Sequence, residues 1–194
     1  MMHDVVVDLG TTGQSDVTGD VRIRQTILCL LFRPSLDGGT PAFGLVRPVE
    51  GHSSQWIPAQ GPLRGFDRNP LEIVGDDIVP AHFLSATEVL GREFGVLAGI
   101  AFGRVLSQVF EGEIFEGDRG ISTQKRYHVV VCRVGPKTKL QPMCSTIAEA
   151  RWVPGRLDPI LEAMRYASQF KKDLVSRVWN ELVLDDWSPL KSAI

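Results

Sequence analysis

The sequence predicts an α/β (α+β) fold in which a sheet and helices form a single sandwich. Runs of apolar and β-branched residues of strand length occur in two groups along the chain. A segment with apolar residues at helical spacing lies between the groups, and a longer amphipathic segment follows the second. The chain has 194 residues, 43% of them hydrophobic, which suits one domain with a sizeable core.

We expect the folded domain to span residues 21–184. Residues 1–20 form an N-terminal extension that holds a weak strand at Val5–Val7 and is otherwise rich in glycine, threonine, serine and aspartate, the composition of a loop. Residues 185–194 are expected to form a C-terminal tail. The chain shows no internal repeat that would indicate a second unit.

The first strand is predicted at Arg22–Arg33, because this run is long, apolar and rich in β-branched residues. Asp37-Gly38-Gly39 then supplies the positive φ angles that a tight hairpin needs. Ala42–Arg47 is predicted to be the returning strand. We expect His52–Gly61 to be a loop.

The segment Pro62–Val79 contains two prolines and several glycine or asparagine residues, which predicts a long loop or insertion. Pro80 suits the first position of a helix, where its missing N–H would have no partner anyway. We expect this helix to run to Phe94 and to stop at Gly95. The apolar face of the helix is formed by Phe83, Leu90 and Phe94.

Two more strands are predicted at Ile100–Phe110 and Arg126–Val134, and a short strand at Glu149–Val153 follows them. The loop that joins the first two strands is rich in glycine and acids, and it carries Glu111, Glu113 and Glu116. Asp158 is the expected N-cap of a single long amphipathic helix that continues to Leu184.

Composition excludes several classes of function. The formal net charge of −2 leaves no basic footprint, so we expect no bulk nucleic-acid partner. The N-terminus lacks the cationic start of a signal peptide, and no apolar run reaches the length of a membrane span. The three cysteines have no metal-binding spacing, which indicates free thiols and a cytoplasmic location. The oligomeric state is not defined by the sequence, and a homodimer is one option.

Two segments together resemble the signature of Nudix hydrolases, which cleave diphosphate linkages. Ala86–Val96 resembles the Nudix box, and Trp56–Gly61 resembles the loop that precedes the box. Glu149–Pro154 looks like the aromatic strand before the family's closing helix. The resemblance covers roughly residues 21–184 and implies an α/β/α sandwich with a mixed central sheet, a box helix and a long C-terminal helix.

The charged positions of the box are only partly retained. The family pattern ends in Arg-Glu-apolar-any-Glu-Glu-any-Gly-apolar, and its closing pair falls on Gly95 and Val96. The last box glutamate then corresponds to Glu93. The three departures are Glu88 in place of arginine and, in place of glutamates, Val89 and Arg92.

The resemblance implies a metal-dependent hydrolase that acts on a nucleoside diphosphate derivative. Such chemistry needs Mg²⁺ or Mn²⁺ held by carboxylate oxygens, so the candidate metal ligands are Glu93, Glu88 and Asp77. Related enzymes often recruit a loop glutamate as the base, which makes Glu113 and Glu116 catalytic candidates beside Glu93. Structural interpretations stand beside these candidates. Asp76 and Asp77 would be an acidic pair favoured at the start of a helix, and Glu113 and Glu116 would be exposed residues of a loop.

The departures from the pattern support a second hypothesis, a Nudix-fold module that has lost hydrolysis. In this hypothesis the guanidinium of Arg92 contacts a phosphate directly, or the same face binds a protein partner. Trp56, Gln60 and Gly61 would complete the binding surface for a small nucleotide-like ligand. The alternatives are an ion pair of Arg92 with Glu88 or with Glu93, and plain packing of Trp56.

Overall fold

The computed structural model describes residues 15–18, 21–36, 39–50, 54–64, 71–74, 77–116 and 122–184. Several sequence-based expectations lie outside these residues: the strand at Val5–Val7, the turn residues Asp37 and Gly38, Asp76, and the tail at 185–194.

A seven-stranded sheet forms the centre of the described structure. Its main path runs β7-β8-β2-β3-β9, and both β1 and β4 pair with β2 beside this path. The strands are β1 (Ser15–Thr18), β2 (Val21–Arg33), β3 (Ala42–Pro48), β4 (Ala59–Pro62), β7 (Ala101–Glu116), β8 (Ser122–Arg133) and β9 (Ile147–Pro154). Because β2 and β8 are parallel whereas the other pairs are antiparallel, the sheet is mixed, as expected.

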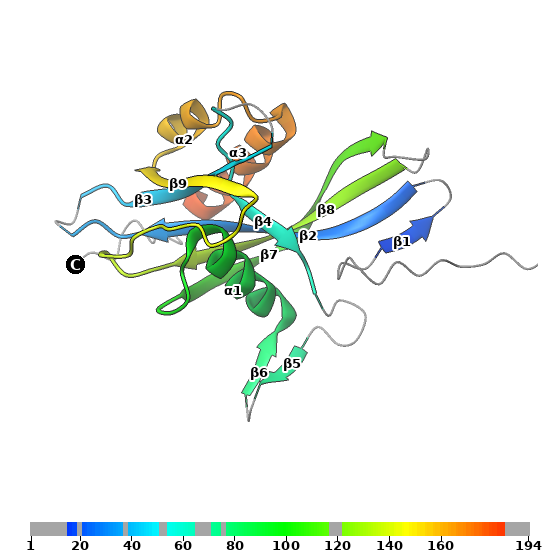
Figure 1. The fold of residues 1–194 in the computed structure, drawn as a ribbon, viewed down its shortest axis with the longest axis horizontal. Coiled ribbons are helices and arrows are strands. Elements are labelled where there is room, and N and C mark those ends of the chain that lie inside the picture. The colour runs from blue at the N-terminus through cyan, green and yellow to red at the C-terminus, as the bar shows by residue number, and fades with distance from the viewer. Residues whose placement is uncertain are drawn as a thin grey trace, which may run out of the picture.

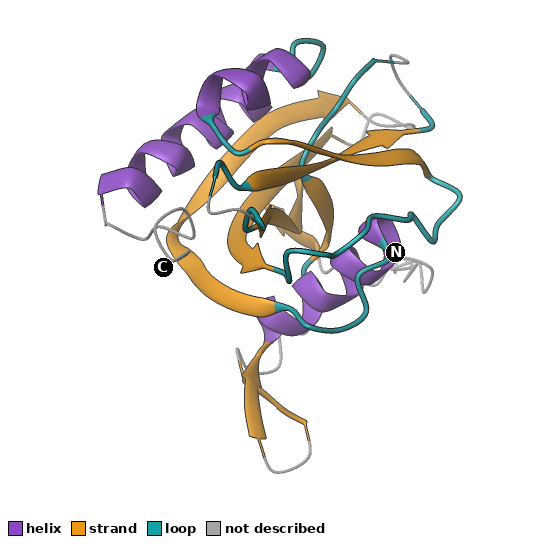
Figure 2. Cartoon of the chain, turned by 90° about the vertical axis from the view of Figure 1, so that its left-hand side faces the viewer, coloured by secondary structure: helices purple, strands orange, loops and turns teal. Residues whose placement is uncertain are grey.

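Helices lie on both sides of this sheet. Figures 1 and 2 show α1 (Ala81–Phe94) on one side, and α2 (Leu157–Ala163) and α3 (Gln169–Leu184) on the other. Residues 25–32 of β2 are all buried. A strand covered on both faces is apolar throughout and does not alternate, which explains the unbroken apolar run in the sequence.

Strand pleating assigns each side chain of β2 and its partners to one of the two helical layers. The ring of Phe32 lies 6.0 Å from that of Trp179 in α3, so even-numbered residues of β2 point towards α3. His128 is paired with Ile27 and contacts His82 of α1, so odd-numbered residues point towards α1. We call these two surfaces of the sheet the α3 face and the α1 face.

The sequence predicted a loop at His52–Gly61, but the end of this segment is a strand. Ala59–Pro62 forms β4, which pairs antiparallel with residues 26–29 of β2. Proline and glycine disfavour strands on their own, but Pro62 is the last residue of β4, where a missing N–H costs little. Pairing with the most buried strand of the sheet overrides the weak local preference.

The insertion at Pro62–Val79 also contains regular structure where a loop was predicted. β5 (Leu71–Val74) and β6 (Asp77–Pro80) pair with each other in a separate two-stranded sheet. Pro80 is the last residue of β6 rather than the first of the helix, which begins at Ala81. The helix ends at Phe94 and Gly95 has a φ of 70°, as predicted for its stop.

The predicted C-terminal helix is two helices. Residues 164–168 separate α2 from α3, and the backbone N–H of Lys171 donates to Ser168 Oγ at 3.4 Å, which caps the start of α3. Asp158 is not an N-cap: Arg156 holds that position of α2, and Asp158 lies in the first turn. The apolar spacing continues across the break, so periodicity alone does not reveal it.

β7 is longer than predicted and includes the residues that were expected to form an acidic loop. Glu111, Glu113 and Glu116 all lie on β7, and register shifts interrupt its pairing with β8. Glu111 is opposite Arg126, and their side chains form an ion pair at 3.3 Å. Cross-strand pairing of opposite charges explains how an acid-rich segment extends the strand.

Candidate functional site

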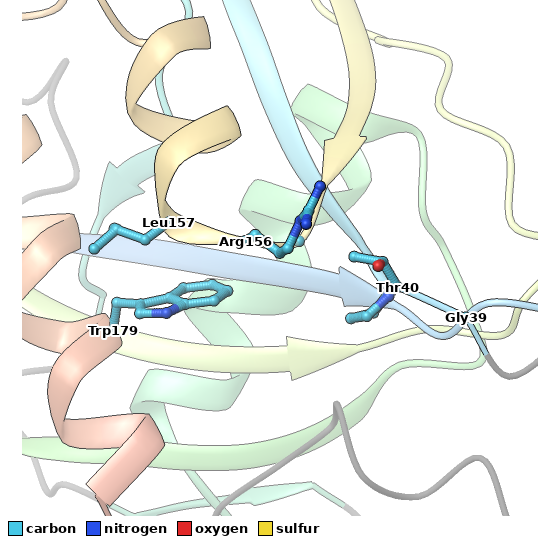
Figure 3. Close-up of a pocket in the computed structure, with 7 residues that line it drawn as sticks. Gly39, Thr40, Arg156, Leu157 and Trp179 are labelled. Carbon is cyan, nitrogen blue, oxygen red and sulfur yellow. The ribbon is translucent and has the colours of Figure 1, made fainter.

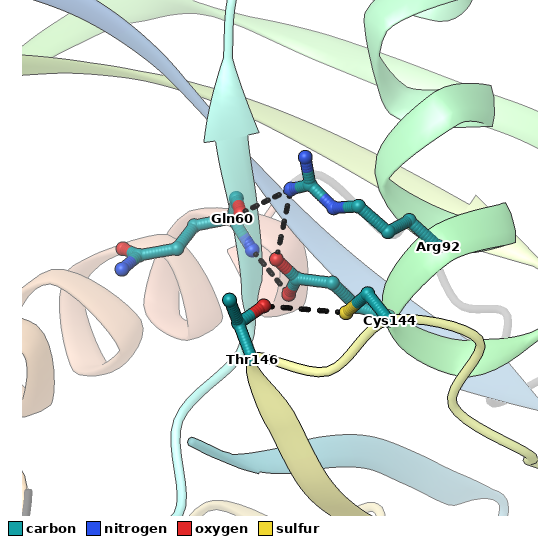
Figure 4. A network of polar contacts seen from close by, with 5 residues as sticks. Gln60, Arg92, Cys144 and Thr146 are labelled. Carbon is teal, nitrogen blue, oxygen red and sulfur yellow. Dashed lines mark hydrogen bonds and ion pairs between the residues drawn. The ribbon is translucent and has the colours of Figure 1, made fainter. Parts of the chain in front are cut away.

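Glu93 is the centre of a small polar network at the end of α1, and its partners Gln60 and Arg92 are labelled in Figure 4. Its side chain is only 7% exposed. The backbone N–H of Gln60 donates to Glu93 Oε2 at 3.1 Å, and Nη2 of Arg92 lies 3.1 Å from Oε1. Both carboxylate oxygens therefore already have a donor from the protein.

Arg92 lies at the surface side of this network, with 44% of its side chain exposed. Its two contacts, to Glu93 and to the carbonyl oxygen of Gln60 at 3.5 Å, both use Nη2. Figure 4 shows Arg92 extending from α1 towards β4. The Nε and Nη1 donors of Arg92 have no partner among the described residues, so they are available to a ligand.

Burial raises the pKa of the Glu93 carboxyl above its ordinary value. The hydrogen bond from Gln60, the charge and hydrogen bond of Arg92, and the charge of Lys171 act in the opposite direction. The influence of Lys171 shows that a residue of α3 lies within electrostatic reach of the box helix. Sequence reasoning did not identify Lys171, because nothing local marks it.

Val89 and Gly61 form the contact between α1 and β4 beside this network. Val89 is 2% exposed, and a Cβ added at Gly61 would lie 2.5 Å from Val89 Cγ2 and 3.0 Å from Arg92 Nη2. The position that the family gives to a metal-binding glutamate is therefore filled by a buried isopropyl group. Glycine at position 61 allows β4 to approach the helix this closely.

The described side chains do not fit a divalent metal at this position. Glu88 forms an ion pair with Nε of Arg64 at 3.0 Å, and not with Arg92. Glu93 is paired with Arg92, and within the described residues no three histidine, cysteine or acidic side chains gather at metal-binding spacing. The side chains of Asp77, Glu113 and Glu116 lie outside the described part of the structure, so their assignments stay predictions.

Trp56 belongs to the hydrophobic core and is 7% exposed. The guanidinium of Arg151 in β9 lies over its ring, 3.9 Å from the centroid. This geometry fits the packing interpretation of Trp56, because one ring face is already covered by a cation.

A histidine pair lies near the start of α1, and its two members are distant in the sequence. His82 Nε2 is 3.2 Å from His128 Nδ1, and His128 Nε2 is 2.9 Å from Oε1 of Gln25. Because an amide oxygen only accepts, His128 donates from Nε2 and accepts at Nδ1 from His82. Burial lowers the pKa of His128 to about 4, and it also lowers that of His82, so both rings are neutral at pH 7. Neither side chain has a neighbour in sequence that could have revealed the contact.

An open pocket of about 390 Å³ lies apart from this network, at the β2–β3 turn and the start of α2 (Figure 3). Arg156 and Thr40 lie on one side of it and the indole of Trp179 on another. None of the residues predicted for the site lines this pocket, which contains no carboxylate.

Comparison with solved structures shows that the chain has the Nudix fold, as the resemblance implied. The Nudix hydrolase RenU from M. smegmatis has a TM-score of 0.57 at 16% identity, over 84% of this chain and 89% of that one. Ap4A hydrolase from C. elegans, in a binary complex, has a TM-score of 0.53 at 14% identity, over 82% and 97%. The Nudix domain of Shewanella oneidensis NrtR, complexed with ADP ribose, has a TM-score of 0.50 at 12% identity, over 81% and 87%.

No protein-family model and no curated protein matches the sequence. At identities this low, the likeness establishes the architecture and leaves activity and substrate to the residues of the site. Cys29 and Cys132 are buried free thiols, as expected. Among the described residues, no helix is both long and apolar enough to cross a bilayer.

Proposed function

We propose that this chain is a Nudix-fold binding module that recognises a nucleotide-like ligand through its phosphate groups, with Arg92 as a direct phosphate contact and without a metal ion. The observation that supports this proposal best is the position of Arg92, whose Nη2 lies 3.1 Å from Glu93 Oε1. The guanidinium thus pairs with the carboxylate that the resemblance assigns to a metal ion. A guanidinium presents paired donors that match phosphate oxygens.

Two further contacts support this proposal. Glu93 holds Arg92 in place, because its other oxygen is fixed by the Gln60 N–H. Val89 excludes a second carboxylate from the contact with Gly61. The structural relatives supply probe ligands: one is an Ap4A hydrolase and another was obtained with ADP ribose. Both compounds contain an adenosine that is linked through a chain of phosphates to a second ribose unit, and we infer a ligand of this chemical class.

The test is calorimetric titration with ADP ribose and with diadenosine tetraphosphate, each in EDTA. We expect wild-type protein to bind at least one of them, and Arg92→Ala to weaken binding about tenfold or more, because a hydrogen bond to a charged group is lost. Arg165→Ala is the matched control, since Arg165 also pairs with a glutamate at 3.1 Å but lies on the exposed surface between α2 and α3. Equal affinity in wild type and Arg92→Ala, or no binding of either probe, would contradict the proposal.

Metal-dependent hydrolysis of a nucleoside diphosphate derivative is the second candidate. It is favoured by Glu93, which matches the last box glutamate and lies in the final turn of α1. Incubation of both probes with Mg²⁺ or Mn²⁺ separates the two candidates. If product forms with wild type and not with Glu93→Gln, the chain is a hydrolase rather than a binding module.

A further inference from the structure

The side chain of Lys171 extends from the side of α3 that packs against the sheet. It starts a stripe at helical spacing whose other members are all buried: Leu174, Val175, Val178 and Leu182. The preceding residue, Phe170, has its ring centroid 5.4 Å from that of Tyr127 in β8. The ammonium group of Lys171 is therefore carried towards the α3 face of the sheet and away from bulk solvent.

Strand register brings two more polar side chains to this face. Tyr127 marks the α3 face of β8, and Lys125 points the same way because it is two residues away. On β4, Gln60 is paired with Leu28, an even-numbered residue of β2, so its amide also lies on the α3 face. Figure 4 shows the Gln60 side chain directed away from Arg92. Gln60 thus joins both sides: its N–H holds Glu93, and its amide points to the side of Lys171.

Two lysines and one amide oxygen on this face have no partner among the described residues. The ammonium groups of Lys125 and Lys171 have no hydrogen bond or ion pair within the described residues, although both side chains are partly buried. Gln60 Oε1 is buried and has no hydrogen-bond partner in the described part of the chain. Burial lowers the pKa of Lys171 to about 8; the charge of Lys125 lowers it further, and that of Glu93 opposes the shift. Burial and the charge of Arg24 also lower the pKa of Lys125. Buried cations that repel one another are stabilised by an anion between them.

We propose that Lys171 and Lys125 form a second phosphate-binding position on the α3 face of β4, with Gln60 Oε1 accepting a hydrogen bond from a hydroxyl of the same ligand. The inference rests on the proposed function, since the ligand that Arg92 contacts would carry a further phosphate for this second position. Glu93 does not repel such a ligand strongly, because Arg92 neutralises its charge at 3.1 Å.

The experiment uses inorganic pyrophosphate and ADP ribose as probes, titrated at pH 7 against the full chain. We expect Lys171→Met to weaken the binding of both probes about tenfold or more. Lys125→Met should weaken their binding as well. Lys171→Arg retains most of the affinity because it keeps the charge. Lys172→Met is the matched control: this neighbour is also a partly buried lysine of α3, but it points in another direction around the helix axis. The affinity of this variant should equal that of wild type.

Proton uptake provides a readout that a merely structural role of Lys171 would not produce. A bound phosphate favours the charged ammonium, so binding near pH 8.5 takes up protons, measured as the dependence of binding heat on buffer ionisation enthalpy. We expect this uptake in wild type and a reduced uptake in Lys171→Met. If Lys171→Met does not fold, Lys171→Arg must abolish the uptake near pH 8.5 while it retains binding.

The two proposals fail in different ways. If Arg92→Ala weakens the binding of the probes and Lys171→Met does not, the second position is refuted and the proposed function stands. If Lys171→Met weakens pyrophosphate and Arg92→Ala has no effect, the second position stands and Arg92 is not a contact. Pyrophosphate that does not bind to wild type overturns the second position.

Discussion

Val89 and Gly61 meet so closely that neither position can accept a larger side chain without movement of α1 or β4. The nearest neighbour of a Cβ at position 61 is a branched methyl group 2.5 Å away, which is part of a stiff β-branched residue. The same contact holds the Gln60–Glu93 hydrogen bond in register, since Gln60 precedes Gly61 on β4. Packing at this point therefore fixes the geometry of the polar network.

We expect Gly61→Ala to lower the free energy of unfolding by about 1–3 kcal/mol through overpacking. The double variant Gly61→Ala/Val89→Ala removes the clashing methyl group, so its loss should be smaller than the sum of the two single losses. Urea unfolding of the four proteins measures the coupling. Strict additivity would show that the two side chains do not share one space.

At the residue scale, the sequence indicated a side-chain contact between residues adjacent in the chain, but not the contacts between residues far apart in the chain. Arg92 and Glu93 are neighbours on one helix, and their ion pair was among the predicted options. The contact of His82 with His128 and the electrostatic link of Lys171 to Glu93 join residues on different elements. Such contacts depend on register and helix docking, which no local pattern encodes.

α1 is held at its C-terminal end by the chain that precedes β9. The N–H of Gln141 donates to the carbonyl of Phe94 at 2.8 Å, and that of Met143 to the carbonyl of Arg92 at 2.9 Å. These bonds satisfy carbonyls that a helix end leaves without partners. Gly95 must be a glycine for two reasons: its φ is 70°, and a Cβ would meet the backbone oxygen of Gln141.

Gly99 offers a matched comparison, because it has the same φ of 70° and a Cβ added there would have no heavy atom within 4 Å. We expect Gly99→Ala to cost about 1–2 kcal/mol from the left-handed conformation alone. Gly95→Ala should cost clearly more and should also weaken phosphate binding, since the clash displaces the turn that carries Arg92. Equal losses of unfolding free energy in the two variants would show that the Gln141 contact is not restrictive.

At the scale of elements, most strands and the box helix could be predicted because the apolar pattern that defines each of them lies within its own segment. β4 could not be predicted, since Ala59–Pro62 is a strand only through its pairing with β2. The division of the last helix was hidden by apolar spacing that continues through residues 164–168. Ser168 was the one local signal of a new helix start.

The histidine pair connects three parts of the whole molecule: His82 is on α1, His128 on β8 and Gln25 on β2. Its hydrogen bonds require neutral rings in the arrangement described. Protonation of His128 puts a charge into a buried position, and the charges of His82 and Arg126 oppose it further. The stability of the entire sandwich is therefore linked to pH through one contact between its layers.

His128 has a pKa of about 4 in the folded protein and an ordinary value of 6.5, so the unfolded chain binds more protons between these values. The stabilisation is complete above pH 6.5 and is lost as the pH falls towards 4, by at most about 3 kcal/mol. His128→Gln cannot titrate, and its unfolding free energy should fall less over this interval. Parallel slopes of wild type and variant in urea titrations from pH 8 to 4 would contradict the assignment.

The parallel pairing of β2 with β8 has a consequence for how the chain is made. Val21 is paired with Ser122 and Phe32 with Arg133, so β2 leaves the ribosome long before its main partner exists. Strand pairs this distant in sequence form slowly, because a long loop must close first. During synthesis β2 remains an apolar strand with a bare edge, the kind of surface that attracts chaperones and other nascent chains. We expect chains truncated before residue 122 to aggregate, whatever ligand the finished protein binds.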